Sequence, residues 1–236
     1  MPRMAAGPTQ PMIEPKWPKL LSLAVHEFRS PLTVVAGYIR MLLKERAGPV
    51  PDQQRRLLEE AEKSCARLSQ LLAEVSELAH LEAGTVAFSR SAVDLRTLLA
   101  DMIATLPDLR DRTVTVELVA NEGVEAHGDA ARLKDALAAI VIALRRELVT
   151  SDLMTVRVER VSVADKPTAR ITVGEADRMP RLLALTREEL GTFDEWRGGN
   201  GLSLANARRV IEAHGGLLLA PLDDGRAGAI AFIPSL

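Results

Sequence analysis

A histidine beside an acidic residue stands near the start of this chain, in the stretch LAVHEFRSPLTVV at residues 23–35. An imidazole changes its charge near neutral pH and can act as a base or a nucleophile, and His26 has the carboxylate of Glu27 next to it. Ser30 and Pro31 follow, and the proline removes one backbone N–H from any helix that contains it. Either these residues form a reactive site, or His26 is an ordinary surface histidine beside an ordinary glutamate.

The surrounding residues predict a helix from about Trp17 to Ala47. Its apolar residues recur at alternating four- and three-residue steps, which is the heptad pattern of helices that pack along a seam. Because His26 comes one position after a seam residue, we expect its ring to face outward, with Ser30 and Thr33 on the same side. Pro31 should loosen or bend the helix just beyond the histidine. The seam residues are Leu21, Val25, Phe28, Leu32, Val35, Ile39 and Leu42.

A second heptad helix follows the sequence AGPVPDQ at residues 47–53, with Asp52 as a candidate N-cap and Gly84 as a candidate C-cap. Two such helices joined by a short loop predict an antiparallel hairpin. A lone hairpin leaves half of its apolar surface in water, so we expect two chains to pair into a dimeric four-helix bundle. Cys65 falls in the second seam, where a packed core thiol is expected. The seam residues are Leu58, Ala61, Cys65, Leu68, Leu72, Val75 and Ala79.

The pattern changes after Gly84, and the rest of the chain predicts short strands and helices in alternation. This order is typical of an α+β fold in which one sheet is covered by helices. We therefore expect a flexible tail at 1–16, a helical hairpin at 17–85 and an α/β sandwich at 86–236. The predicted elements are a helix capped near Asp94, strands at 112–120, 154–163, 169–175 and 227–235, and helices at 129–148 and 201–216.

Composition excludes several other classes of protein. A net charge of −2 and an aromatic content of 3% argue against a nucleic-acid-binding surface. A single cysteine excludes an intramolecular disulfide and metal sites built on paired cysteines, and the four histidines show no zinc-ligand spacing. The longest apolar run, LAAIVIAL at 137–144, is too short to cross a bilayer, and the N-terminal prolines do not suit a secretory signal. We therefore expect a soluble cytoplasmic protein without a membrane span.

The string around the histidine resembles the phosphoacceptor motif of two-component histidine kinases, His-Glu-x-x-(Ser/Thr/Asn)-Pro-Leu. His26, Glu27, Ser30, Pro31 and Leu32 match it. The resemblance implies that His26 carries a phosphoryl group on one ring nitrogen while Glu27 accepts a hydrogen bond from the other. It also implies that Ser30 stands where the family often has a threonine or asparagine that orients water for dephosphorylation of the partner.

The resemblance further implies a partner, the receiver domain of a response regulator. Helical geometry and the family analogy place its docking surface beside the histidine, along Ser30, Thr33, Gly37 and Arg40 and the facing part of the second helix.

The second half resembles the ATP-binding sandwich of the same family, through HGDAARLKDAL at 127–137, TFDEWRGG at 192–199 and GGNGLSLANARRVIEAHGG at 198–216. Magnesium-binding asparagines of the family should appear where this chain has Ala139 and Ala143, and alanine cannot ligate a metal. The adenine-binding loop reads GEADRMP at 174–180. It lacks both family glycines, and Glu175 is a candidate for the aspartate position.

Only the loop GNGLSL at 199–204 keeps glycines, so Gly199 and Gly201 are candidate phosphate contacts. The sequence thus predicts a degenerate nucleotide site, and it argues against ATP and Mg²⁺ as working cofactors. His214 is interpreted as a structural residue, and His80 and His127 as surface residues.

Three hypotheses follow. The first is a dimeric histidine phosphotransferase that exchanges phosphate with the aspartate of a receiver domain. The second is an active ATP-dependent sensor histidine kinase with a divergent pocket, in which Glu175 contacts adenine and Asp135 or Glu147 holds a metal. The third is a pseudokinase scaffold without catalysis, which binds a receiver domain or another kinase.

Overall fold

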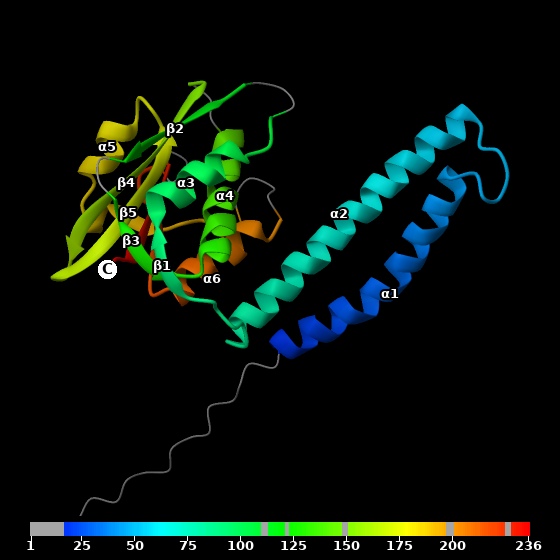
Figure 1. Ribbon diagram of the computed structural model, residues 1–236, viewed down its shortest axis with the longest axis horizontal. Coiled ribbons are helices and arrows are strands. Elements are labelled where there is room, and N and C mark those ends of the chain that lie inside the picture. The colour runs from blue at the N-terminus through cyan, green and yellow to red at the C-terminus, as the bar shows by residue number, and fades with distance from the viewer. Residues whose placement is uncertain (1–16, 110–112, 121–122, 148–150, 197–200, 225–227) are drawn as a thin grey trace, which may run out of the picture.

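The computed structural model of the chain describes residues 17–109, 113–120, 123–147, 151–196, 201–224 and 228–236. A long helical hairpin stands beside a mixed α/β domain (Figure 1), which confirms the α+β prediction. None of the helices within these ranges combines the length and the apolar character that crossing a membrane requires.

The hairpin consists of α1 (Trp17–Leu43) and α2 (Asp52–Glu82), which run antiparallel (Figure 1). Ala36, Ile39 and Cys65 form its buried core, so the cysteine is a packed core thiol as predicted. The prediction that Asp52 caps α2 is wrong. Pro51 holds the N-cap position in an extended conformation, and Asp52 is already the first helical residue.

Ala83 is the C-cap of α2, and Gly84, the predicted cap, is the residue that follows it. Gly84 adopts a left-handed conformation (φ 64°), which glycine reaches without steric cost. Its N–H donates to the carbonyl of Leu81, and the N–H of Thr85 donates to the carbonyl of His80. These two bonds pair carbonyls at the end of α2 and turn the chain toward the second domain.

The seam of α1 is only partly covered within one chain. Val25 and Ile39 are buried, but Phe28 is 62% exposed and Val35 is 49% exposed. Apolar side chains of this size are seldom left in water along a whole helix face. The open side of the seam is the surface that the predicted dimer would cover.

The second domain is built on a six-stranded sheet in the order β2-β4-β5-β8-β7-β6, with a separate two-stranded sheet of β1 and β3. β2 runs parallel to β4, and the other neighbours in the large sheet are antiparallel. The strands are β1 (Ser91–Asp94), β2 (Thr115–Ala120), β3 (Glu125–Gly128), β4 (Leu153–Val163), β5 (Lys166–Glu175), β6 (Leu190–Thr192), β7 (Leu217–Pro221) and β8 (Gly228–Pro234).

Three helices, α3 (Leu95–Ala104), α4 (Ala130–Glu147) and α6 (Ser203–Ala213), lie between the sheet and the hairpin (Figure 1). Their apolar faces and the sheet form one continuous core, in which Leu99, Leu137 and Ile171 are almost fully buried. The short helix α5 (Met179–Ala184) packs against β5. Asp94 caps α3 as predicted and accepts a hydrogen bond from the backbone N–H of Arg96 at 2.9 Å.

The predicted strands and helices of this domain are present, with ends that differ by a few residues. Strands β3, β6 and β7 and helix α5 were not predicted. They are short, and periodicity is not visible over so few residues.

Two glycines let α6 turn directly into β7. Gly215 has a φ of 75°. A Cβ atom on Gly216 would collide with the carbonyl oxygen of Phe232 and would lie 2.9 Å from Cγ2 of Ile211. The backbone of strand β8 therefore passes too close to residue 216 for any side chain.

We predict that Gly216→Ala lowers the free energy of unfolding by about 1–3 kcal/mol, the usual cost of overpacking. Gly37→Ala is the matched control, because nothing lies within 4 Å of the added methyl group on α1. Alanine favours helix, so the control should be neutral or slightly stabilising. Urea unfolding of both variants measures the difference, and equal stabilities would contradict this account of the α6–β7 turn.

Candidate functional site

His26 lies on the first half of α1 with its side chain 78% exposed. Its Nδ1 atom is 3.5 Å from Oε1 of Glu27, whose side chain is 72% exposed. At this distance an Nδ1–H can donate a weak hydrogen bond to the carboxylate. That arrangement would leave the lone pair on Nε2 directed toward solvent, which is the state in which an imidazole can attack an electrophile.

The packing of α1 explains why the ring points outward. Val25 is only 4% exposed, on a helix that packs along α2, and the next residue along a helix is turned by about 100°. Pro31 is contained within α1, so the carbonyl of Glu27 has no N–H donor four residues later. The hydroxyl of Thr33 donates to the carbonyl of Arg29 at 2.8 Å, so this carbonyl, next to the proline, has a side-chain donor.

The residues predicted to contact a partner form a strip along the same side of α1. Ser30, Thr33 and Arg40 are exposed, and Gly37 is half-buried with free space around it. Arg40 reaches across to α2, where its Nε is 3.3 Å from Oε1 of Glu62. Their role in binding stays a prediction.

A cavity of about 1040 Å³ lies between the hairpin and the second domain. Leu71 and Glu74 of α2 line one side, and the residues of α4 that line the other include Asp135, Ala139 and Ile142. Ala139 thus faces this space, whereas Ala143 is fully buried in the core. The side of the cavity formed by α4, where a metal would need amide or carboxylate ligands, is thus mostly apolar.

The donors present do not fit a magnesium ion. Among the described residues, no group of three histidine, cysteine, aspartate or glutamate side chains is placed to hold a metal. Asp135 is the acidic residue that α4 contributes to the cavity, and Glu147 is absent from the described lining. Mg²⁺ prefers an octahedral set of oxygen ligands, and the two carboxylates that line the cavity, Glu74 and Asp135, do not by themselves supply one.

Of the other predicted nucleotide contacts that the structure describes, Gly201 lines this cavity and Glu175 does not. Glu175, at the end of β5, is only 5% exposed, and its Oε2 is 3.1 Å from Nε of Arg178. It does not line the cavity. Gly199 lies outside the described residues. Gly201 does line the cavity, in a left-handed conformation with φ 63°.

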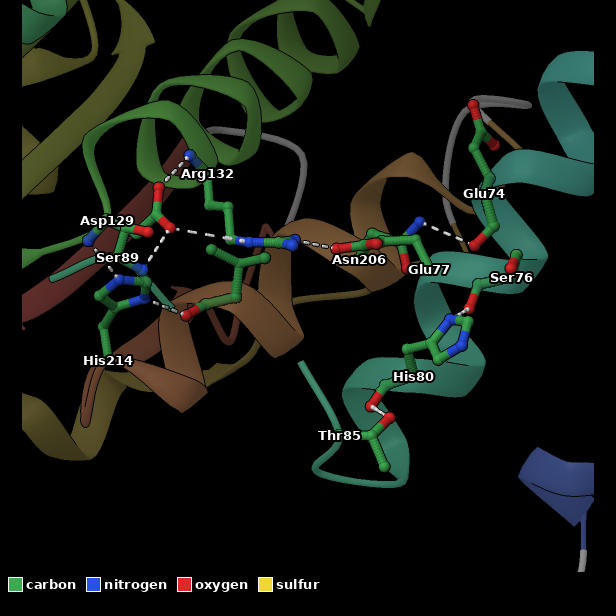
Figure 2. A network of polar contacts seen from close by, with 11 residues as sticks. Glu74, Ser76, Glu77, His80, Thr85, Ser89, Asp129, Arg132, Asn206 and His214 are labelled. Carbon is green, nitrogen blue, oxygen red and sulfur yellow. Dashed lines mark hydrogen bonds and ion pairs between the residues drawn. The ribbon is translucent and has the colours of Figure 1, made fainter. Parts of the chain in front are cut away.

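A row of contacts joins α2 to the second domain, and sequence reasoning missed it (Figure 2). Oε2 of Glu74 accepts the backbone N–H of Leu202 at 3.0 Å, and the side-chain amide of Asn206 donates to the carbonyl of Glu74 at 3.0 Å. Further along α2, Glu77 forms an ion pair with Arg132 of α4. Acidic residues on a heptad helix usually indicate a solvated face, so no signal in the sequence distinguished these.

Glu82 adds a second ion pair at the end of α2, with Arg209 of α6. Burial of Arg209 by itself would lower its pKa, but hydrogen bonds to the carboxylates of Glu82 and Glu212 outweigh this effect and raise it. The guanidinium is therefore held in its charged form between the two domains.

His214 is structural, in agreement with its interpretation from the sequence. Its Nε2 accepts the backbone N–H of Asp129 at 3.0 Å, and its Nδ1–H donates to the carbonyl of Val210 at 2.7 Å (Figure 2). Burial lowers the pKa of His214, so the neutral ring is favoured, and only the neutral ring can accept at Nε2. His80 and His127 are exposed, as expected.

We predict that His214 makes folding sensitive to acid. Because its folded pKa lies below its unfolded value of about 6.5, its stabilising contribution is complete above pH 6.5 and is lost as the pH falls through the folded pKa. In His214→Gln, thermal stability should fall less between pH 7.5 and 5.5 than in the wild type. His80→Gln, which replaces an exposed histidine, should keep the wild-type slope, and parallel curves for all three proteins would contradict this role.

Comparison with known proteins agrees with this geometry. Residues 19–84 match the family described as the His Kinase A (phospho-acceptor) domain. The circadian input-output histidine kinase CikA of Synechococcus elongatus is 26% identical over 206 residues, which cover 84% of this chain and 27% of that protein. The phosphate regulon sensor protein PhoR of Pseudomonas aeruginosa is 29% identical over 196 residues, which cover 80% of this chain and 43% of that protein. The chain thus spans less than half the length of these relatives.

Solved structures share the fold along most of the chain. Full-length ShkA in complex with AMPPNP superposes with a TM-score of 0.69 at 20% identity, covering 92% of this chain and 46% of that one. The histidine kinase AdeS of Acinetobacter baumannii gives a TM-score of 0.56 at 16% identity, covering 89% of this chain and 97% of that one. A helical hairpin followed by a mixed α/β domain is therefore an arrangement that this chain shares with histidine kinases.

Proposed function

We propose that this chain, which belongs to the two-component histidine kinase family by its phospho-acceptor domain, works as a histidine phosphotransferase. It takes a phosphoryl group from the phospho-aspartate of one receiver domain, holds it on His26, and passes it to the aspartate of another. The observation that carries this proposal is the exposed ring of His26, with Nδ1 turned toward Glu27 and Nε2 open to solvent.

The chemistry requires little from the histidine side. The Nε2 lone pair attacks phosphorus, an N–P bond forms, and the P–O bond to the aspartate breaks, which returns a free carboxylate to the receiver domain. Glu27 would stabilise the positive charge that develops on the ring through the Nδ1–H bond. The receiver domain supplies its own aspartate and Mg²⁺.

Features of the second domain favour a phosphoryl donor other than ATP. The cavity wall has Ala139 and Ile142 facing the space between α2 and α4, and Glu175 is paired with Arg178 away from that space. The charged side chains that line the cavity are two arginines, Arg67 and Arg146, and two carboxylates, Glu74 and Asp135. The carboxylates offset the arginines, and the described residues bring together no metal-binding group to neutralise a triphosphate.

An active kinase is the second candidate, because a cavity of about 1040 Å³ is large enough for a nucleotide. In that case ATP itself would label His26. A scaffold without catalysis is the third, and it would require neither His26 nor Glu27.

Two surfaces complete the proposal. Phe28 and Val35, which are open in the single chain, would be covered by a second copy in a four-helix bundle. A receiver domain would dock along the strip of Ser30, Thr33, Gly37 and Arg40, which lies beside the open ring.

The decisive assay offers two phosphate donors to the purified chain. We predict that a labelled phospho-receiver domain transfers acid-labile phosphate to the wild type and that labelled ATP with Mg²⁺ does not. His26→Gln should lose all label, and His80→Gln should keep it. Label from ATP on His26 would establish the kinase instead, and full biological activity of His26→Ala would favour the scaffold.

We also predict that Gly37→Phe slows transfer at least tenfold, equivalent to about 1.4 kcal/mol. The bulky ring would stand in the proposed docking strip, where the free chain has space for it. Gly37→Ala is the matched control and should transfer at close to the wild-type rate. Sedimentation would verify that both variants keep the wild-type oligomeric state, and normal transfer by a folded Gly37→Phe protein would exclude this docking surface.

A further inference from the structure

The N-terminus of α6 is bound by a side chain from the hairpin. The first N–H groups of any helix lack partners within it and carry a partial positive charge. At α6, the N-cap residue Leu202 offers no side-chain cap. Its backbone N–H donates instead to Oε2 of Glu74, 128 residues earlier in the chain, at 3.0 Å.

The surroundings hold this carboxylate in place. Gln70 donates to Oε1 of Glu74 at 3.2 Å, and Asn206 donates to its backbone carbonyl at 3.0 Å. Gly201 makes room for it, because a Cβ atom at this position would lie 2.9 Å from Oε2. Gly201 therefore leaves room for a carboxylate that the chain itself supplies.

The other end of α6 meets a charge of the opposite sign. Arg90, in the segment between α2 and β1, donates from Nη2 to the carbonyl of Ala213, the last residue of α6, at 2.6 Å. An anion at the N-terminus and a cation at the C-terminus both match the helix dipole. The ion pairs of Glu77 with Arg132 and Glu82 with Arg209 lie between these two contacts.

We propose that α2 supplies the anion for this helix end: Glu74 occupies the anion position beside Gly201 at the N-terminus of α6. This contact, here called the clasp, holds the second domain to α2. The inference rests on the proposed function and extends it. It assigns the second domain the role of holding the hairpin in place, while the side chain of His26 stays exposed. A phosphate-bearing ligand could reach the N-terminus of α6 only by displacing Glu74, which opposes it by both charge and space.

Hydrogen exchange of the full chain tests the clasp without any phosphoryl transfer. In Glu74→Ala, amides at the start of α6 and in residues 70–82 should exchange about fivefold faster, which corresponds to the loss of a typical helix cap of about 1 kcal/mol. Glu74→Gln keeps an acceptor oxygen without the charge and should fall between Glu74→Ala and the wild type. Glu59→Ala, at an exposed position near the start of α2, is the control and should match the wild type.

Wild-type exchange rates in Glu74→Ala would overturn the clasp, whatever the transfer assays show. The wild type gives a second test in case the variant does not fold. Salt screens these charged contacts, so proteolysis within residues 83–90 should accelerate about threefold or more from 0.05 to 1 M NaCl. A rate of cleavage that is independent of salt would also contradict the proposal. If these two tests confirm the clasp but the chain transfers no phosphoryl group, only the proposed function would be rejected.

Discussion

The burial of one apolar stripe of α1 against α2 is the constraint on which the rest of this molecule depends. Val25 and Ile39 are withdrawn from water, and their burial sets the rotation of α1 about its axis. Once that rotation is set, His26 must leave the helix to one side of the stripe. The exposure of the ring is therefore a consequence of hydrophobic packing on the adjacent side of the same helix, and it needs no dedicated support around the histidine.

The second domain shares its fold with solved histidine kinases, and its polar groups contact other residues of the chain. Glu175 is paired with Arg178, Ala139 stands on the cavity wall, and Glu74 meets the N-terminus of α6. The carboxylates of Glu175 and Glu74 are thus already engaged by groups within the chain. A domain of this kind can still contribute stability and orientation to the hairpin, because its apolar core is complete.

The sequence predicted best where the pattern repeats. Long heptads located α1 and α2, and local chemistry located the Asp94 cap and the Gly84 turn, since both depend on one residue and its immediate neighbours. Asp52 failed as a cap because Pro51 already held the extended conformation that precedes the helix.

The features that the sequence did not predict depend on contacts between residues far apart in the chain. The strand β3 is four residues long and is recognisable only through its pairing with β1. The contact of Glu74 with Leu202 joins residues that are 128 apart, and no periodicity connects them. The sequence also did not show which seam residues one hairpin covers: Val25 and Ile39 are buried in the single chain, whereas Phe28 and Val35 are exposed.

The central claim is that Nε2 of His26 carries the phosphate, and phosphorus NMR of the chain mixed with a phosphorylated receiver domain tests it most directly. The account predicts a phosphoramidate signal assigned to Nε2 of His26, which appears as the acyl phosphate of the receiver domain disappears. Decay of the acyl phosphate without such a signal, or a phosphoramidate on any other histidine, would contradict it.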